Sequence, residues 1–266
     1  MTARANDRRH RPPLQVSLHG RTALVTGSGR NIGRALALAF AEAGANVVVN
    51  GHRDRVAVER VAAEVRERGV QALALMADVS DHAEVARMVA QAEAGIGGID
   101  IAVSNVGMRD TRSLLDITPA QWRTVMATNL DSAFYLARAV LPGMRARNWG
   151  RIIHMSGRTG FFPKAERAHI GTSKAGLHAL AKVIAIEFGP YGVTANTLAP
   201  GIIDTERSAD THPGFEAEFA RRGQAMPVRR LGTTADVTAL CLYLASDDAS
   251  FMTGQLFHIN GGEFMA

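Results

Sequence analysis

A glycine-rich turn near the start of the sequence has the spacing of a phosphate-binding loop. It reads Thr26-Gly27-Ser28-Gly29-Arg30-Asn31-Ile32-Gly33, a G-x-G-x-x-x-G pattern. Glycines allow a sharp turn and a close approach of the backbone to a pyrophosphate, and the N-terminus of the following helix offers free N–H groups. The turn follows the first strand of an expected βαβ unit and therefore predicts dinucleotide binding. A tight strand-to-helix connection without a ligand is the alternative.

Basic side chains follow several of the expected strands and could bind an anion. They are Arg109, Arg112, Arg158 and Arg207, with Lys164 and Arg167 in the loop before a later helix. In an open α/β sheet, ligands lie outside the carboxyl ends of the strands. Two or three of these charges meeting there would hold a carboxylate or a phosphate, so we expect a small, anionic substrate. Solvated loop charges are the alternative.

Short aliphatic or β-branched runs alternate with longer helical patterns from residue 21 onward. The strands are expected at residues 22–26, 46–50, 72–75, 101–104, 151–155, 193–198 and 255–259, and the helices at residues 32–43, 55–68, 82–94, 119–147, 172–188 and 234–244. The strand runs are continuously apolar, which is typical of strands buried on both faces. The predicted fold class is therefore α/β, a Rossmann-type doubly wound sheet of seven parallel strands flanked by helices.

The pattern divides the chain into an arm and a domain. Residues 1–17 are basic and lack an apolar period, so we expect a flexible N-terminal arm. Residues 18–266 are expected to form one Rossmann-fold domain. The least regular part, around residues 205–230, combines charges with Pro and Gly and is expected to be a substrate lid.

The composition excludes several classes of protein. Hydrophobic residues are 47% and charged residues 21% of the 266, which is ordinary for a globular chain and excludes wholesale disorder. The sequence has no apolar stretch of about 18 residues that could span a membrane. The net charge is +5, but the basic residues are scattered and aromatics are 6%, which argues against nucleic-acid binding. The single cysteine, Cys241, fits a reducing cytosol, and we expect a cytoplasmic protein without a metal site.

The glycine turn and later motifs together resemble the short-chain dehydrogenase/reductase family over about residues 18–262. The family carries TGxxxGxG at the turn, where Asn31 replaces the middle glycine, and Asn tolerates left-handed backbone. The other motifs are Asp78-Val79, Ser104-Asn105-Val106-Gly107, Asn129, Lys174, Pro200-Gly201 with Ile203 and Thr205, and Asn260-Gly261-Gly262. The resemblance implies a nicotinamide dinucleotide cofactor. Its expected contacts are Gly27, Ser28, Arg30, Asn31, Ile32, Gly33, Arg53, Asp78, Val79, Asn105, Gly107, Lys174, Pro200, Gly201, Ile203 and Thr205.

The end of the second strand favours NADP(H) over NAD(H). NAD-binding folds place an acid there for the ribose 2′-hydroxyl. Here the strand runs through Asn50 to Arg53 without an acid, and Asp54 is expected to begin the next helix. Arg53 and Arg30 would both face a 2′-phosphate. The alternative is that Arg53 is a solvated surface charge.

The resemblance implies four catalytic positions, of which this sequence fills two. In the family a Tyr passes the proton, a Lys lowers the Tyr pKa and holds the ribose, a Ser binds the substrate oxygen, and an Asn keeps a relay water. Lys174 and Asn129 match, whereas Ile170 and Gly157 stand at the Tyr and Ser positions. Isoleucine neither donates nor accepts a hydrogen bond, and general acid catalysis is worth about 10²–10⁴-fold. We therefore expect an atypical active site with a non-standard proton donor.

Three neighbouring residues are candidates to act instead. His169 has a side chain suited to proton transfer at neutral pH, although it lies about 100° round a helix from the Tyr position. A helix-start or interface histidine is the alternative. Ser156 precedes the Ser position and would point to the opposite face of its strand. Arg158 follows the Ser position and is the strongest candidate for binding an anionic substrate, whereas His154 is expected to be buried and hydrogen-bonded.

Three functions remain open at this point. The first is an NADP(H)-dependent oxidoreductase acting on a small, anionic carbonyl or alcohol substrate. The second is a non-redox lyase, isomerase or dehalogenase with His169 as base, and the third is a cofactor-binding regulatory subunit without catalysis. The resemblance also implies a homodimer or homotetramer, in which the helices at 119–147 and 172–188 pair between subunits.

Overall fold

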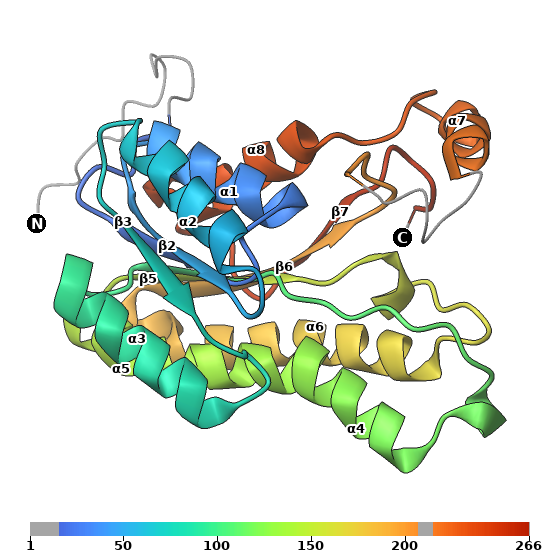
Figure 1. The fold of residues 1–266 in the computed structure, drawn as a ribbon, viewed down its shortest axis with the longest axis horizontal. Coiled ribbons are helices and arrows are strands. Elements are labelled where there is room, and N and C mark those ends of the chain that lie inside the picture. The colour runs from blue at the N-terminus through green and yellow to red at the C-terminus, as the bar shows by residue number, and fades with distance from the viewer. Residues whose placement is uncertain (1–15, 207–214, 266) are drawn as a thin grey trace, which may run out of the picture.

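Seven parallel strands form one sheet in the computed structural model, which describes residues 16–206 and 215–265 (Figure 1). The strands are β1 (Thr22–Val25), β2 (Asn46–Gly51), β3 (Ala72–Met76), β4 (Ile101–Ser104), β5 (Gly150–Met155), β6 (Val193–Pro200) and β7 (Leu256–Ile259). Their order is β3-β2-β1-β4-β5-β6-β7, so the winding reverses between β1 and β4. Ligands of doubly wound sheets bind beside such a reversal. The predicted Rossmann-type α/β class is confirmed.

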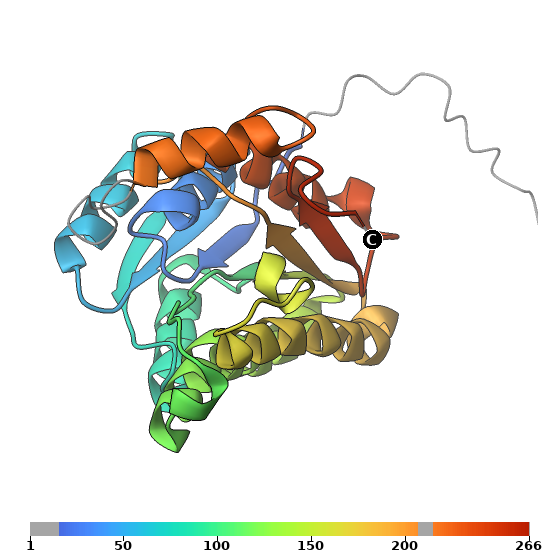
Figure 2. The ribbon, with the colours of Figure 1, turned by 90° about the vertical axis from the view of Figure 1, so that its right-hand side faces the viewer.

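Helices cover both faces of this sheet (Figure 2). They are α1 (Asn31–Glu42), α2 (Arg55–Arg66), α3 (His82–Ile96), α4 (Pro119–Met126), α5 (Ser132–Arg147), α6 (Ala168–Phe188), α7 (Phe215–Ala225) and α8 (Thr234–Ala245). One apolar core joins the sheet to α1, α2 and α8, and a second joins it to α3, α5 and α6. The strands β1 and β4 are buried at every position, which explains their continuous apolar pattern.

Side-chain caps fix the starts of four helices. Asp54 accepts from the backbone N–H of Ala57 at the start of α2, and Asp81 caps α3 in the same way. Thr118 and Thr233 each form a reciprocal capping box, at α4 and α8. The prediction that Asp54 begins a helix is confirmed, so this acid is not at the end of β2.

Two predicted helices differ from the structure. The pattern at residues 119–147 predicted one continuous helix, but a π-helical turn at Ala127–Asp131 separates α4 from α5. Helix α6 starts at Ala168 rather than at residue 172, so His169 and Ile170 belong to its first turn. The apolar period does not register either feature, because a π turn inserts one residue and a first turn carries little hydrophobic pattern.

Parts of the predicted arm and lid lie outside the described residues. These are residues 1–15 of the arm and residues 207–214 of the lid, including Arg207. The rest of the predicted lid region contains α7. Within the described part of the chain, no helix has the length and apolar character to cross a membrane.

Candidate active site

The glycine-rich turn has a shape that other side chains would block. Gly27 has a φ of +61°, and a Cβ added to Gly33 would overlap the Gly27 carbonyl oxygen. Asn31 has a φ of +52°, in the left-handed region expected for it. Arg30 precedes α1 without a side-chain cap, unlike the residues that begin α2, α3, α4 and α8. The first N–H groups of α1 are therefore available to an anion.

Two asparagines, of which Asn50 is buried and Asn105 partly exposed, hold this turn against the sheet. Asn50 at the end of β2 accepts from Gly27 N at 3.1 Å and donates to the carbonyl oxygens of Leu75 and Ala77. Asn105 after β4 donates to the carbonyl oxygens of Thr26 and Gly27. The sequence reasoning treated Asn50 only as a missing acid. A polar residue at the end of an apolar strand was the available signal of its role.

The residues after β2 and β3 bring charges together. Arg30 and Arg53 are exposed, and neither forms an ion pair within the described residues. His52 Nδ1 lies 3.6 Å from Asp78 Oδ2. Burial opposes ionisation of Asp78, but hydrogen bonds from Ser80 and the charges of His52 and Arg53 outweigh it and lower its pKa. Val79 is buried beside it.

Lys174 and Asn129 meet beside Gly107 at the carboxyl end of β4. A Cβ on Gly107 would lie 3.1 Å from Lys174 Nζ and 3.9 Å from Asn129 Oδ1. Lys174 Nζ donates to the Met155 carbonyl oxygen at 2.8 Å. Burial, and next the charge of Arg109, lower the pKa of Lys174 to about 8.

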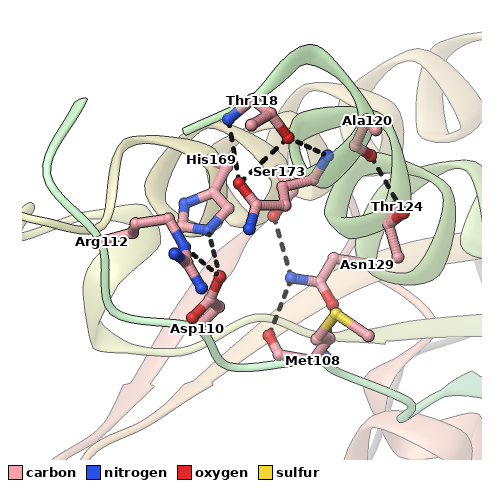
Figure 3. Close-up of polar contacts among 10 residues, drawn as sticks. Met108, Asp110, Arg112, Thr118, Ala120, Thr124, Asn129, His169 and Ser173 are labelled. Carbon is pink, nitrogen blue, oxygen red and sulfur yellow. Dashed lines mark hydrogen bonds and ion pairs between the residues drawn. The ribbon is translucent and has the colours of Figure 1, made fainter. Parts of the chain in front are cut away.

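Asn129 lies in the π-helical turn and clamps the loop that follows β4 (Figure 3). Its Oδ1 accepts from Met108 N at 2.7 Å, and its Nδ2 donates to the Met108 carbonyl oxygen and to Ser173 Oγ. Ser173 in turn donates to the Ile170 carbonyl oxygen. The side chain of Asn129 therefore connects this loop to the first turn of α6.

Gly157 and Ile170 occupy the two positions where the family resemblance implied Ser and Tyr. Ile170 is buried in the first turn of α6, four residues before Lys174. Gly157 follows β5 with a φ of +155°, which side-chain-bearing residues rarely adopt, and no atom lies within 4 Å of a Cβ added there. The space in front of Gly157 is open.

Two of the residues predicted to act in place of Tyr and Ser, His169 and Ser156, contact other protein groups. His169 has no exposed surface, and its Nε2 lies 3.6 Å from Asp110 Oδ2, which also accepts from Arg112 (Figure 3). Ser156 Oγ donates to the Lys174 carbonyl oxygen and lies 2.8 Å from His178 Nε2. Burial lowers the pKa of His178 to about 4, so this ring is neutral at pH 7.

His154 is buried as predicted, but the predicted hydrogen bond is wrong. Neither of its ring nitrogens has a hydrogen-bond partner within the described residues. The ring lies on the same face of the sheet as Lys174, and burial together with the Lys174 charge lowers its pKa to about 3. Because the His154 ring is neutral at pH 7, it needs no acidic partner at this buried position.

The predicted basic residues fall into two sets. Arg112 pairs with Asp110, and Arg158 pairs with Glu263, which Arg222 of α7 also approaches at 3.4 Å. Arg158 is therefore not a free anion receptor. The other set is Arg109, Arg167 and Lys164, none of which forms an ion pair within the described residues. Partial burial, and next the charge of Arg167, lower the pKa of Arg109, so these two cations lie close together.

The segment after β6 reaches back to the glycine turn. Pro200 ends β6, and Gly201 N donates to the Ile259 carbonyl oxygen of β7. Ile203 is buried and forms an isolated bridge with Gly232, while Thr205 is partly exposed. Asn31 Nδ2 donates to the carbonyl oxygen of Glu206, the last described residue before the gap. The glycine turn and the segment after β6, which are both expected to contact the dinucleotide, therefore lie together at one edge of the sheet.

Comparison with known proteins places the chain in a family. Residues 27–263 match the family model described as enoyl-(acyl carrier protein) reductase. The chain is 35% identical to the 3-oxoacyl-[acyl-carrier-protein] reductase FabG of Pseudomonas aeruginosa, over 94% of this chain and 100% of that protein. It is 34% identical to the D-beta-hydroxybutyrate dehydrogenase of Cupriavidus necator, over 92% and 98%. It therefore belongs to the short-chain dehydrogenase/reductase family of oxidoreductases.

A solved structure agrees with this assignment. The chain is similar to the gluconate 5-dehydrogenase of Burkholderia cenocepacia in complex with NADP and tartrate, with a TM-score of 0.84 and 34% sequence identity. The match covers 93% of this chain and 96% of that one. The family-model match spans residues 27–263, which include every element that carries the candidate site.

Proposed function

We propose that this protein is an NADP(H)-dependent oxidoreductase that interconverts a carbonyl and an alcohol on a small, anionic substrate, with Lys174 as the proton donor. One observation carries the proposal: Lys174 is buried, has no acidic partner among the described residues, and lies beside an intact dinucleotide cradle, by which we mean the glycine-rich turn and the start of α1. When bound, the nicotinamide supplies or accepts the hydride. Every other group that the reaction needs must come from the protein chain.

The cradle fits a dinucleotide with a 2′-phosphate. Only glycine fits at Gly33, and the uncapped start of α1 offers N–H donors for the pyrophosphate. At the end of β2 the buried Asn50 is turned toward the backbone, so no acid there would repel a 2′-phosphate. Arg30 and Arg53 are exposed and would pair with it. The NADP in the gluconate 5-dehydrogenase structure supports the same choice.

Lys174 is the proton donor that the site leaves available. A general acid works best when its pKa lies near the working pH, and burial brings the pKa of Lys174 to about 8. Its Nζ keeps two further N–H donors beyond the bond to the Met155 carbonyl oxygen. The alternative base of a non-redox enzyme, His169, has no exposed surface and faces Asp110. The oxidoreductase is therefore the better-supported function.

Arg109, Arg167 and Lys164 support an anionic substrate. These cations lie in the loops that follow β4 and precede α6, at the carboxyl edge of the sheet. Partial desolvation and the charges of Arg158, Arg222 and Arg167 lower the pKa of Lys164 against the opposing attraction of Glu263, so Lys164 lies among cations with one acid nearby. A carboxylate of the substrate would relieve this repulsion.

An apolar groove between α5 and α6 supports self-association. It has a volume of about 750 Å³ and is lined by Phe134, Leu141, Leu180, Val183, Ile184 and Phe188. Arg138, Arg145 and Glu187 also line it and can pair across a two-fold axis. We propose that a second copy of the chain covers this groove in a homodimer or homotetramer. Light scattering should give at least twice the monomer mass, and Val183→Glu should reduce it to the monomer.

The catalytic proposal is tested by the pH dependence of reduction. NADPH consumption is measured with a panel of small oxo acids and ketones, and kcat/KM should fall as the pH rises above about 8, because Lys174 loses its proton there. Lys174→Met should abolish turnover, while the matched variant Lys182→Met, on the exposed side of α6, should retain it. A profile that stays flat to pH 10 would exclude Lys174 as the acid, and absence of turnover on the whole panel would exclude the function.

A further inference from the structure

Glu263, in the turn that follows β7, has one carboxylate oxygen that the protein leaves unused. Its Oε1 is bound by Arg158 and approached by Arg222 at 3.4 Å. Its Oε2 is buried and has no hydrogen-bond partner among the described residues. A buried acceptor without a donor costs free energy, so an unpaired one calls for an explanation.

The position of this oxygen is fixed by the local backbone. Gly262 N donates to Asn260 Oδ1, and Asn260 Nδ2 donates to the Phe264 carbonyl oxygen. Glu263 N donates to the Asn260 carbonyl oxygen in the same turn. The carboxylate is thus held between α7 and the end of β5 by two arginines and a tight turn. It is preorganised before any ligand arrives.

The unused oxygen lies at the edge of the candidate active site. A Cβ on Gly201, which follows β6, would lie 3.5 Å from Glu263 Oε2. Arg158 belongs to the short 3₁₀ turn Arg158–Gly160, and a Cβ on Gly160 would lie 2.8 Å from Lys174 Cβ. A cavity of about 370 Å³ adjoins Glu263 and is lined also by Arg222, Ala225, Met226, Pro227 and Gly262. Such a volume suits a small molecule.

We propose that Glu263 Oε2 accepts a hydrogen bond from a hydroxyl group of the substrate, which makes the substrate a hydroxylated carboxylic acid. The inference rests on the proposed function and specifies its substrate class. A carboxylate oxygen can only accept a hydrogen bond, so its ligand must bring a donor. An ionised substrate carboxylate has no proton to donate and therefore does not satisfy this oxygen. The substrate carboxylate therefore binds on the side of Arg109 and Arg167, and its hydroxyl group binds at Glu263.

The kinetic test compares two oxo acids that differ only in their hydroxyl groups, 5-oxogluconate and 5-oxohexanoate. The wild-type protein should reduce the hydroxylated acid with a kcat/KM at least about 10²-fold higher, because a buried acceptor rejects a ligand that leaves it unpaired. Glu263→Ala should lower kcat/KM for 5-oxogluconate by about 10²-fold and change that for 5-oxohexanoate less than about threefold. Glu218→Ala, which removes an exposed acid from α7, is the matched control and should retain the wild-type preference.

A binding measurement separates this inference from the proposed function. Titration calorimetry of the NADPH-loaded protein with gluconate and with hexanoate involves no turnover, because neither acid has a keto group that the reduced cofactor could reduce. Gluconate should bind at least tenfold more tightly, and Glu263→Ala should remove the difference. Equal loss of both oxo-acid activities in Glu263→Ala, or equal binding of both acids to the wild-type protein, would overturn the role of Glu263. If gluconate binds selectively but no oxo acid is reduced, the proposed function fails while the hydroxyl site stands. If neither acid binds, the site itself is refuted.

Discussion

Replacing Lys174 by Met should make the protein more stable at neutral pH while it removes activity. Burial lowers the pKa of Lys174 from 10.5 to about 8. The unfolded chain keeps this proton up to about pH 10.5, so the folded state is penalised below pH 8 and the penalty disappears as the pH rises toward 10.5. A shift of this size corresponds to about 3 kcal/mol. The lost hydrogen bond to the Met155 carbonyl oxygen offsets about 1 kcal/mol of the gain.

The net expectation is a stabilisation of about 2 kcal/mol at pH 7, or about 4–8 °C in Tm for a chain of this size. Urea unfolding of the wild-type protein and Lys174→Met at pH 7 and pH 10 measures it, and the gain should shrink at pH 10. Lys182→Met, on the exposed side of the same helix, should change the stability by less than about 0.5 kcal/mol at either pH. Destabilisation by Lys174→Met at pH 7 would show that the buried ammonium is not penalised and would refute its lowered pKa.

Four further substitutions test the rest of the site. Arg53→Ser should weaken NADPH binding at least tenfold in a fluorescence titration and leave NADH affinity unchanged; equal loss of both would place Arg53 away from the 2′-phosphate. Gly33→Ala should abolish binding of either cofactor, because its Cβ meets backbone, whereas Gly189→Ala, in open space, should not. Asn129→Ala loses three hydrogen bonds and should cost about 3 kcal/mol in urea unfolding, and a cost below about 1 kcal/mol would contradict the clamp. Gly157→Ser should cost about 1–3 kcal/mol, matched by Gly157→Ala, because the strain comes from the backbone and not from the hydroxyl.

The sequence predicts the sheet and the glycine turn well because both depend on local patterns. Short continuous apolar runs bounded by turn residues are typical of strands buried on both faces, and the strand bounds differ from the expected ones by one or two residues at most, as at β2 and β6. The turn needs glycine at Gly33 for a steric reason that the sequence expresses directly. The glycine-rich turn and the sheet with its helices can therefore be derived from the periodicity and spacing of the sequence.

The candidate catalytic region is predicted less well because it depends on contacts between distant segments. The role of Arg158 as a free anion receptor required that no acid lie nearby, and Glu263, more than a hundred residues later, supplies one. The position of His169 in the sequence predicts a ring near the expected tyrosine position, whereas in the structure the ring faces Asp110 of another loop. Residue type and spacing specify which groups are present near the strand ends. Only the fold specifies which of them neutralise one another.

Gly157 and Ile170, at the positions where the family resemblance implied Ser and Tyr, differ from those residues in different ways. Gly157 adopts a φ that a serine would rarely adopt, so the position differs from a serine site in its main chain as well as in its side chain. Ile170 is buried in the first turn of α6, four residues before Lys174, whose pKa is lowered to about 8 by burial and next by the charge of Arg109. A tyrosine at position 170 would place a phenol beside Lys174. Lys174 would then interact with that phenol rather than with the substrate. Without a phenol at position 170, Lys174 Nζ keeps two N–H donors beyond its bond to the Met155 carbonyl oxygen, as the proposed function requires.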